Sequence, residues 1–153
     1  MHKNEFIKAL EDLDINITEL QLKQLDIYYK MLIDYNTHTN LTRITDEKEV
    51  YLKHFYDSLT LIKAYNLRKE VSLCDVGTGA GFPGIVLAIC FPQLNVTLIE
   101  KLRKKVDFLF LVKKELELNN MFICNEKVEV FARNNIEKYD IVTSRAFARL
   151  NKL

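Results

Sequence analysis

The chain has 153 residues, of which 48% are hydrophobic and 28% charged, and its net charge is +1. This composition excludes a disordered chain, and the length predicts one domain with at most a short appendage. The longest apolar run, Ile85 to Phe91, has seven residues, far fewer than the roughly 18 that span a membrane. No secretory signal is visible at the start, and the three cysteines lack a CxxC spacing. We therefore expect a cytoplasmic chain with no membrane contact.

The first part of the chain, residues 1–68, is predicted to be helical. Phe6 and Leu10 recur at helical spacing, and Thr18 with Gln21 is typical of a capping box that opens a second helix. Residues 35–42 are rich in small polar side chains and predict a loop. Asp46 is then expected to cap a third helix. The apolar residues expected along the second and third helices are Leu22, Leu25, Tyr28, Tyr29, Leu32, Leu52, Phe55, Leu59 and Ile62.

The pattern changes near residue 70, where short apolar segments begin to alternate with helical ones. Helices are predicted over residues 84–91 and 103–119. The four predicted strands are residues 71–76, 95–100, 127–131 and 139–144. Strands that alternate with helices indicate a parallel α/β sheet with right-handed crossovers. We therefore expect a helical segment at 1–68 that packs on a sheet domain at 69–153.

All four glycines of the chain, Gly77, Gly79, Gly81 and Gly84, fall in one window of eight residues. An average chain of this length would carry about ten, at roughly 7% of residues. The window follows the first predicted strand and opens a helix, which is where open α/β sheets bind ligands. Concentrated glycine there predicts unusual backbone angles or a ligand that lies close to the backbone.

Two carboxylates flank this loop and indicate what it binds. Asp75 precedes a GxGxG spacing, whereas dinucleotide sites use GxGxxG and place a pyrophosphate at the helix N-terminus. A carboxylate would repel a pyrophosphate, which argues against a nicotinamide-dependent oxidoreductase, but it suits an ammonium or a sulfonium group. Glu100 ends the next strand, where it could accept hydrogen bonds from ribose hydroxyls. S-adenosylmethionine carries all of these groups, so we predict it as the cofactor.

Basic residues gather just after the second predicted strand. Six lie within residues 101–114, opposed there only by Asp107. One interpretation is a solvated helix face, and the other is a phosphate-facing patch that binds RNA. The residues predicted to bind RNA are Lys101, Arg103, Lys104 and Lys105.

Four motifs resemble one family, the bacterial small-subunit ribosomal RNA guanine-N7 methyltransferases, also called glucose-inhibited division protein B. They are Asn40-Leu41-Thr42, Lys53 to Leu59, Asp75 to Gly84, and Ser144 to Ala148. The resemblance implies a Rossmann-like sheet preceded by helices, with the first four strands present, and S-adenosylmethionine as cofactor without a metal. It also implies one guanine in 16S ribosomal RNA as substrate, the ribosomal particle as partner, and a monomer.

The resemblance also implies site residues. Gly77, Gly79, Gly81 and Phe82 would line the cofactor site, Val128 and Glu129 would contact its adenine end, and Arg145 would border it. The N7 atom of guanine has a free lone pair, so attack on the sulfonium methyl needs no general base, and no catalytic residue is nominated. A competing hypothesis is a non-catalytic RNA-binding module that keeps this fold.

Two further features leave alternatives open. One side of a predicted helix carries His54, Asp57 and Ser58. These residues could form a polar wall of the active cleft, or they could form a polar contact between helix and sheet. Arg145 could hold an RNA phosphate or a guanine edge, or form a structural ion pair. The sequence stops at Leu153, short of the family's length, so we expect the fourth strand to form an uncovered sheet edge.

Overall fold

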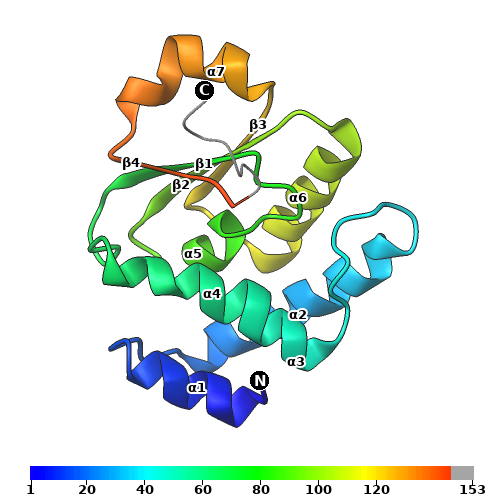
Figure 1. The fold of residues 1–153 in the computed structure, drawn as a ribbon, viewed down its shortest axis with the longest axis vertical. Coiled ribbons are helices and arrows are strands. Elements are labelled where there is room, and N and C mark those ends of the chain that lie inside the picture. Colours follow the sequence, from blue (N-terminus) through cyan, green and yellow to red (C-terminus); the bar gives the residue numbers. More distant parts are fainter. Residues whose placement is uncertain (146–153) are drawn as a thin grey trace.

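A four-stranded parallel sheet forms the centre of the molecule (Figure 1). The computed structural model describes residues 1–145. The strand order is β3-β2-β1-β4, and every neighbouring pair is parallel. The strands are β1 (Ser72–Val76), β2 (Asn95–Glu100), β3 (Met121–Asn125) and β4 (Ile141–Thr143). The predicted α/β class is confirmed, and β4 lies at an edge of the described sheet with Val142 42% exposed.

The third strand was predicted in the wrong place. The strand β3 occupies Met121–Asn125, whereas residues 127–131 belong largely to the helix α7 (Val128–Asn135). Val128 and Phe131 are three residues apart, and both pack with Cys74, Val76 and Ile99 on one face of the sheet. Helical spacing on that face outweighs the strand preference of the two valines, Val128 and Val130.

Helices cover both faces of the sheet. On one face lies α7, and on the other lie α5 (Gly84–Cys90) and α6 (Arg103–Leu116), with the N-terminal helices outside them (Figure 1). Every residue of α5 is buried, because this helix is covered on one side by the sheet and on the other by N-terminal helices. No helix among residues 1–145 is long and apolar enough to cross a membrane.

The N-terminal segment contains α1 (Lys3–Glu11), α2 (Glu19–Asn36) and a long third helix. That third helix runs through α3 (Glu47–Val50), a π-helical turn (Tyr51–Tyr56), α4 (Asp57–Leu59) and a final 3₁₀ turn (Thr60–Lys63). Both predicted caps are confirmed: Thr18 Oγ1 accepts from the Gln21 N–H at 3.1 Å, and Asp46 accepts from the Glu49 N–H at 3.2 Å. Contrary to expectation, Leu52 is 41% exposed, because the π-helical turn shifts it off the buried face.

The N-terminal helices share one apolar core with the sheet domain. Tyr28 of α2 is fully buried, with ring centroids 5.7 Å from Phe55 and 5.5 Å from Phe82. Its hydroxyl donates to the Ala80 carbonyl at 2.6 Å. A helix far away in the sequence thereby holds the glycine-rich loop in place. The three cysteines are free thiols, two of them buried.

Candidate functional site

The glycine-rich loop joins the end of β1 to the start of α5. Gly77, Gly79 and Gly81 have φ angles of 66°, 61° and 105°, a region that side chains with a Cβ rarely adopt. The Thr78 N–H donates to the Ile99 carbonyl of β2 at 3.0 Å, which ties the loop across the strand ends. The expectation of unusual backbone angles in this window is confirmed.

Asp75 lies under the loop and is fully buried. Its Oδ2 accepts from the Thr78 hydroxyl at 2.6 Å and from the Gly84 N–H at 2.8 Å. A Cβ at position 84 would lie 2.9 Å from that same oxygen and would overlap Leu98, so only glycine lets α5 begin this close to β1 and β2. Burial raises the pKa of Asp75 to about 7. The Asp75 side chain thus supports the loop from below, and its contact with a ligand cation stays a prediction.

Glu100 is also buried, with 5% of its surface exposed. Its Oε1 accepts from the Gly79 N–H at 3.0 Å and its Oε2 from the Leu102 N–H at 2.9 Å. A carboxylate offers about four acceptor sites, so two remain for hydroxyl donors. Glu100 thus fixes the loop while it lines the cavity described next.

A cavity of about 540 Å³ opens above the ends of β1, β2 and β3. Five of the predicted cofactor residues line it: Gly77, Gly79, Glu100, Val128 and Glu129. Four further residues line it: Lys101, Leu102, Lys105 and Lys127. The sequence predicts Lys101 and Lys105 to bind RNA, and it gives no role to Leu102 or Lys127. Leu102 is two positions after Glu100, and Lys127 directly precedes Val128. Proximity in the sequence to the predicted contacts was therefore the available signal.

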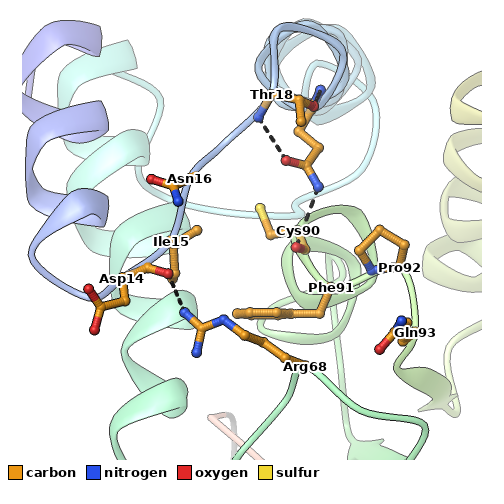
Figure 2. Close-up of a pocket in the computed structure, with 10 residues that line it drawn as sticks. Asp14, Ile15, Asn16, Thr18, Arg68, Cys90, Phe91, Pro92 and Gln93 are labelled. Carbon is orange, nitrogen blue, oxygen red and sulfur yellow. Dashed lines mark hydrogen bonds between the residues drawn. The ribbon is translucent and has the colours of Figure 1, made fainter.

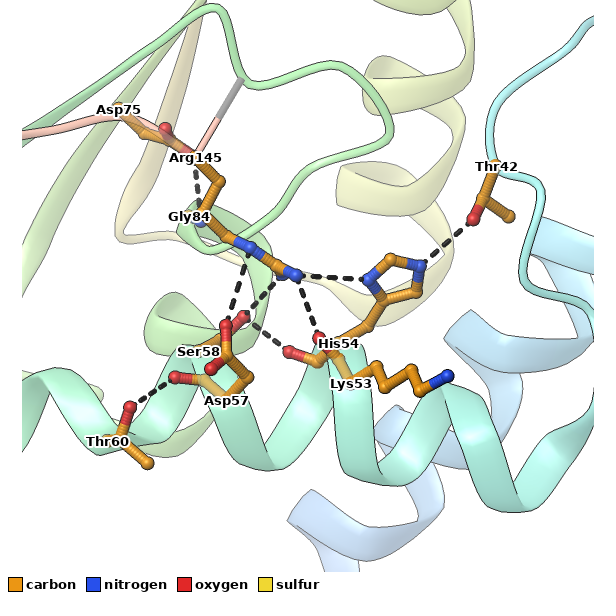
Figure 3. Close-up of polar contacts among 9 residues, drawn as sticks. All are labelled: Thr42, Lys53, His54, Asp57, Ser58, Thr60, Asp75, Gly84 and Arg145. Atoms are coloured by element: carbon orange, nitrogen blue, oxygen red, sulfur yellow. Dashed lines mark hydrogen bonds and ion pairs between the residues drawn. The ribbon is translucent and has the colours of Figure 1, made fainter. Parts of the chain in front are cut away.

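Besides Asp75, three predicted cofactor residues lie outside this cavity: Gly81, Phe82 and Arg145. Gly81 is packed against α5 and α2, since a Cβ there would lie 2.7 Å from the Tyr28 hydroxyl oxygen. Phe82 is 7% exposed and stacks on His54, with ring centroids 4.2 Å apart. Arg145 points toward the long third helix instead of the cavity (Figure 3). These three residues therefore do not line the cavity, and their direct contact with a cofactor stays a prediction.

Arg145 connects the end of β4 to the long third helix (Figure 3). Its Nη2 donates to the Lys53 carbonyl at 2.7 Å, and its Nη1 lies 3.5 Å from the Ser58 hydroxyl oxygen. Its Nε lies 3.6 Å from Asp57 Oδ2. The structure therefore shows a polar helix–sheet contact that includes an ion pair between Arg145 and Asp57, and a role of these residues in the active cleft stays a prediction.

His54 extends this contact to the loop that precedes the helix. Arg145 Nη2 lies 3.4 Å from His54 Nδ1, and a guanidinium can only donate, so Nδ1 accepts. The proton therefore sits on Nε2, which donates to the Thr42 hydroxyl at 2.9 Å. Burial and the Arg145 charge lower the pKa of His54 to about 4, which keeps the imidazole neutral. Three of the four sequence motifs thus meet in one network.

Two of the four predicted RNA-binding residues, Lys101 and Lys105, line the cavity. Lys101, Arg103 and Lys104 are exposed, and Lys105 is half-buried. Arg103 forms an ion pair with Asp107, with its Nε 3.0 Å from Oδ1. Neither Arg103 nor Lys104 lines the cavity. Because Arg103 is paired with Asp107, Lys104 is the better residue for a test that is separate from the cofactor.

A second cavity, of about 460 Å³, lies near the starts of β1 and β2. Figure 2 shows the residues that line it. Its lining includes Arg68, which precedes β1, and Gln93, which precedes β2. Arg68 donates to the Asp14 carbonyl, and Gln21 donates to the Ile89 carbonyl at 3.2 Å. These polar groups join helices to the base of the sheet. Ligands of open α/β sheets bind at the carboxyl ends of the strands, so this cavity is a structural junction.

Comparison with known proteins places this geometry in a family. The family model described as rRNA small subunit methyltransferase G (GidB) matches residues 21–153. The chain belongs to this family. Curated relatives with the name ribosomal RNA small subunit methyltransferase G, from Bacillus thuringiensis (strain Al Hakam) and Bacillus cereus (strain AH820), are 44% identical over the whole chain. The chain spans 65% of the length of these GidB relatives.

Solved structures support the fold alone. Protein-L-isoaspartate O-methyltransferase aligns with a TM-score of 0.54 and 14% identity, covering 81% of this chain and 47% of its own. MtNAS, solved in complex with MTA and tNA, aligns with a TM-score of 0.51 and 14% identity, covering 82% of this chain and 48% of its own. The GidB chain therefore shares the Rossmann-like sheet of these proteins.

Proposed function

We propose that this GidB chain binds S-adenosylmethionine in the cavity above β1, β2 and β3. The observation that carries the proposal is the buried carboxylate of Glu100, which lines an open cavity directly beside Gly77 and Gly79. A Cβ placed on Gly79 would meet no atom within 4 Å, so the space next to this backbone is free for a ligand. Family membership supports the same cofactor.

The residues suit the parts of this cofactor in order across the sheet. Val128 and Glu129 would hold the adenine end, Glu100 would accept from the ribose hydroxyls, and the loop backbone at Gly77 and Gly79 would lie along the methionine part. Lys101 and Lys105 at the cavity mouth give the entrance a positive charge. Asp75 and Tyr28 act indirectly, because each holds the loop by a hydrogen bond.

The proposed reaction is transfer of a methyl group to N7 of a guanine in 16S ribosomal RNA, by a monomer in the cytoplasm. When bound, the cofactor supplies a methyl carbon whose bond to sulfur breaks as the N7 lone pair forms a bond to it. N7 loses no proton in this step, so the protein needs no general base. The residues of the chain act by orientation, which alone accounts for roughly 7–11 kcal/mol of barrier lowering in favourable cases.

Isothermal titration of the chain with S-adenosylhomocysteine tests the cofactor proposal. We expect saturable binding at one site, with no heat from nicotinamide adenine dinucleotide. A folded chain that gives no saturable heat would contradict the proposal. Methyl transfer to small ribosomal subunits from labelled S-adenosylmethionine is the second assay. Binding of both cofactor and RNA without transfer would favour the non-catalytic RNA-binding module.

We predict that Lys104→Ala weakens binding of small-subunit ribosomal RNA and lowers its salt dependence. Loss of one phosphate contact should reduce the slope of log binding constant against log salt by about one unit. The affinity for S-adenosylhomocysteine should stay unchanged, because Lys104 does not line the cavity. Lys23→Ala, at an exposed position on α2, is the matched control. An unchanged slope would assign Lys104 to the solvated face.

A further inference from the structure

A smaller cavity of about 260 Å³ lies between the end of β4 and the long third helix. Thr143 and Arg145 line it from the sheet side, Asp57 and Ser58 from the helix side, and Pro83 from the glycine-rich loop. Its volume is just below the roughly 300–1,000 Å³ of pockets that hold small ligands. Figure 3 shows Asp57 and Arg145 facing each other here. The pocket therefore has room for one compact group.

The order of the strands places this pocket at the reacting end of the proposed cofactor. The cofactor cavity is lined by Glu100 at the end of β2 and by residues that follow β1, β2 and β3, and β4 lies next to β1 on the other side. An adenine near Val128 and a ribose at Glu100 leave the methionine part at β1. The next position across the sheet is the smaller cavity, which shares the loop through Pro83. An acceptor in that pocket would lie next to the transferred methyl group.

The polar groups of the pocket include one acceptor and one donor that are both accessible. The Asp57 side chain is 58% exposed and that of Arg145 is 31% exposed. Lys53, His54 and Ser58 hold the guanidinium from the helix side. Arg145 Nη1 carries two hydrogens. Among residues 1–145, one of them is donated to the Ser58 hydroxyl oxygen. One N–H and the outer part of the carboxylate thus remain for a ligand.

We propose that this pocket receives the target guanine by its Watson–Crick edge, an inference that rests on the proposed function. The Asp57 carboxylate accepts from the N1–H and N2–H groups, and Arg145 Nη1 donates to O6. This arrangement leaves N7 without a partner, as methylation requires. An arginine that bound both O6 and N7, as in the common readout of guanine in DNA, would block the reacting atom. Arg145 cannot turn freely to that arrangement, because three groups of the helix hold it.

Saturation-transfer NMR of the chain with guanosine tests this proposal. Spectra are recorded with and without saturating S-adenosylhomocysteine, which fills the cofactor cavity, and with adenosine for comparison. We expect guanosine to bind with a dissociation constant on the order of 1 mM, and adenosine to bind more weakly when S-adenosylhomocysteine is present. Asp57→Asn should weaken guanosine binding by about tenfold or more, because a charged acceptor is lost.

The control variant is Asp107→Asn, which removes an exposed carboxylate that pairs with Arg103 in the same way. It should leave guanosine binding unchanged, and neither variant should alter S-adenosylhomocysteine affinity or the melting temperature. Equal guanosine binding by the wild type and Asp57→Asn, or none by the wild type, would overturn the proposed guanine site. Failure of S-adenosylhomocysteine to bind would instead overturn the proposed cofactor function, so the two failures are distinguishable.

Discussion

Gly79→Val is expected to abolish S-adenosylhomocysteine binding in a chain that still folds. Gly79 lines the cofactor cavity, and a Cβ built there would meet no protein atom within 4 Å. The two branches of valine would therefore occupy space that the proposed ligand needs. The φ angle of 61° adds backbone strain of roughly 1–2 kcal/mol. We expect an affinity loss beyond the range of calorimetry and a fall of only a few degrees in melting temperature.

Gly79→Ala separates the two causes of this effect. Alanine carries most of the same backbone strain but adds one carbon, so its affinity loss should be much smaller than that of valine. Circular dichroism confirms that both variants are folded. Retained S-adenosylhomocysteine affinity in folded Gly79→Val would show that the ligand does not lie against this part of the loop, and would sink the assignment of the cavity.

Several features of the site follow from local sequence alone. The glycine window predicts positive φ angles because few other residues tolerate them, and three of its four glycines adopt such angles. The capping residues Thr18 and Asp46 act within one helical turn, so their hydrogen bonds need no knowledge of the fold. Glu100 was identified because the ends of neighbouring parallel strands meet at one edge.

Other features depend on contacts that local patterns do not carry. Val128 and Val130 have strand-like side chains, yet helical packing of Phe131 on the sheet determines α7. The burial of Asp75 depends on the close approach of Gly84 and Leu98 from other elements. Arg145 meets Lys53 and His54 across more than 90 positions of sequence. The motifs containing these residues were recognised, but their meeting in one network required the strand order.

The buried carboxyl of Asp75 should make the stability of the chain depend on pH. Burial raises its pKa from an ordinary 3.8 to about 7, and Glu100 adds to this, whereas Thr78, Gly84 and Arg145 oppose it. Between pH 4 and 7 the folded chain therefore binds more protons at this group than the unfolded chain does. The free energy of unfolding should consequently fall as pH rises through this window. Three pKa units correspond to up to about 4 kcal/mol.

His54 acts in the opposite direction, so the wild-type curve alone does not isolate Asp75. Burial lowers the pKa of His54 from 6.5 to about 4, and its contribution to stability rises with pH between those values. We would therefore measure the free energy of unfolding by denaturant for the wild type and for Asp75→Asn from pH 4 to 8. Both proteins retain His54, so its contribution cancels in the difference between them. We expect the stability of the wild type relative to Asp75→Asn to fall across that range. Among residues 1–145, Asp75 Oδ1 has no hydrogen-bond partner. A constant difference would mean that Asp75 keeps its charge throughout, and that a partner outside these residues stabilises the carboxylate.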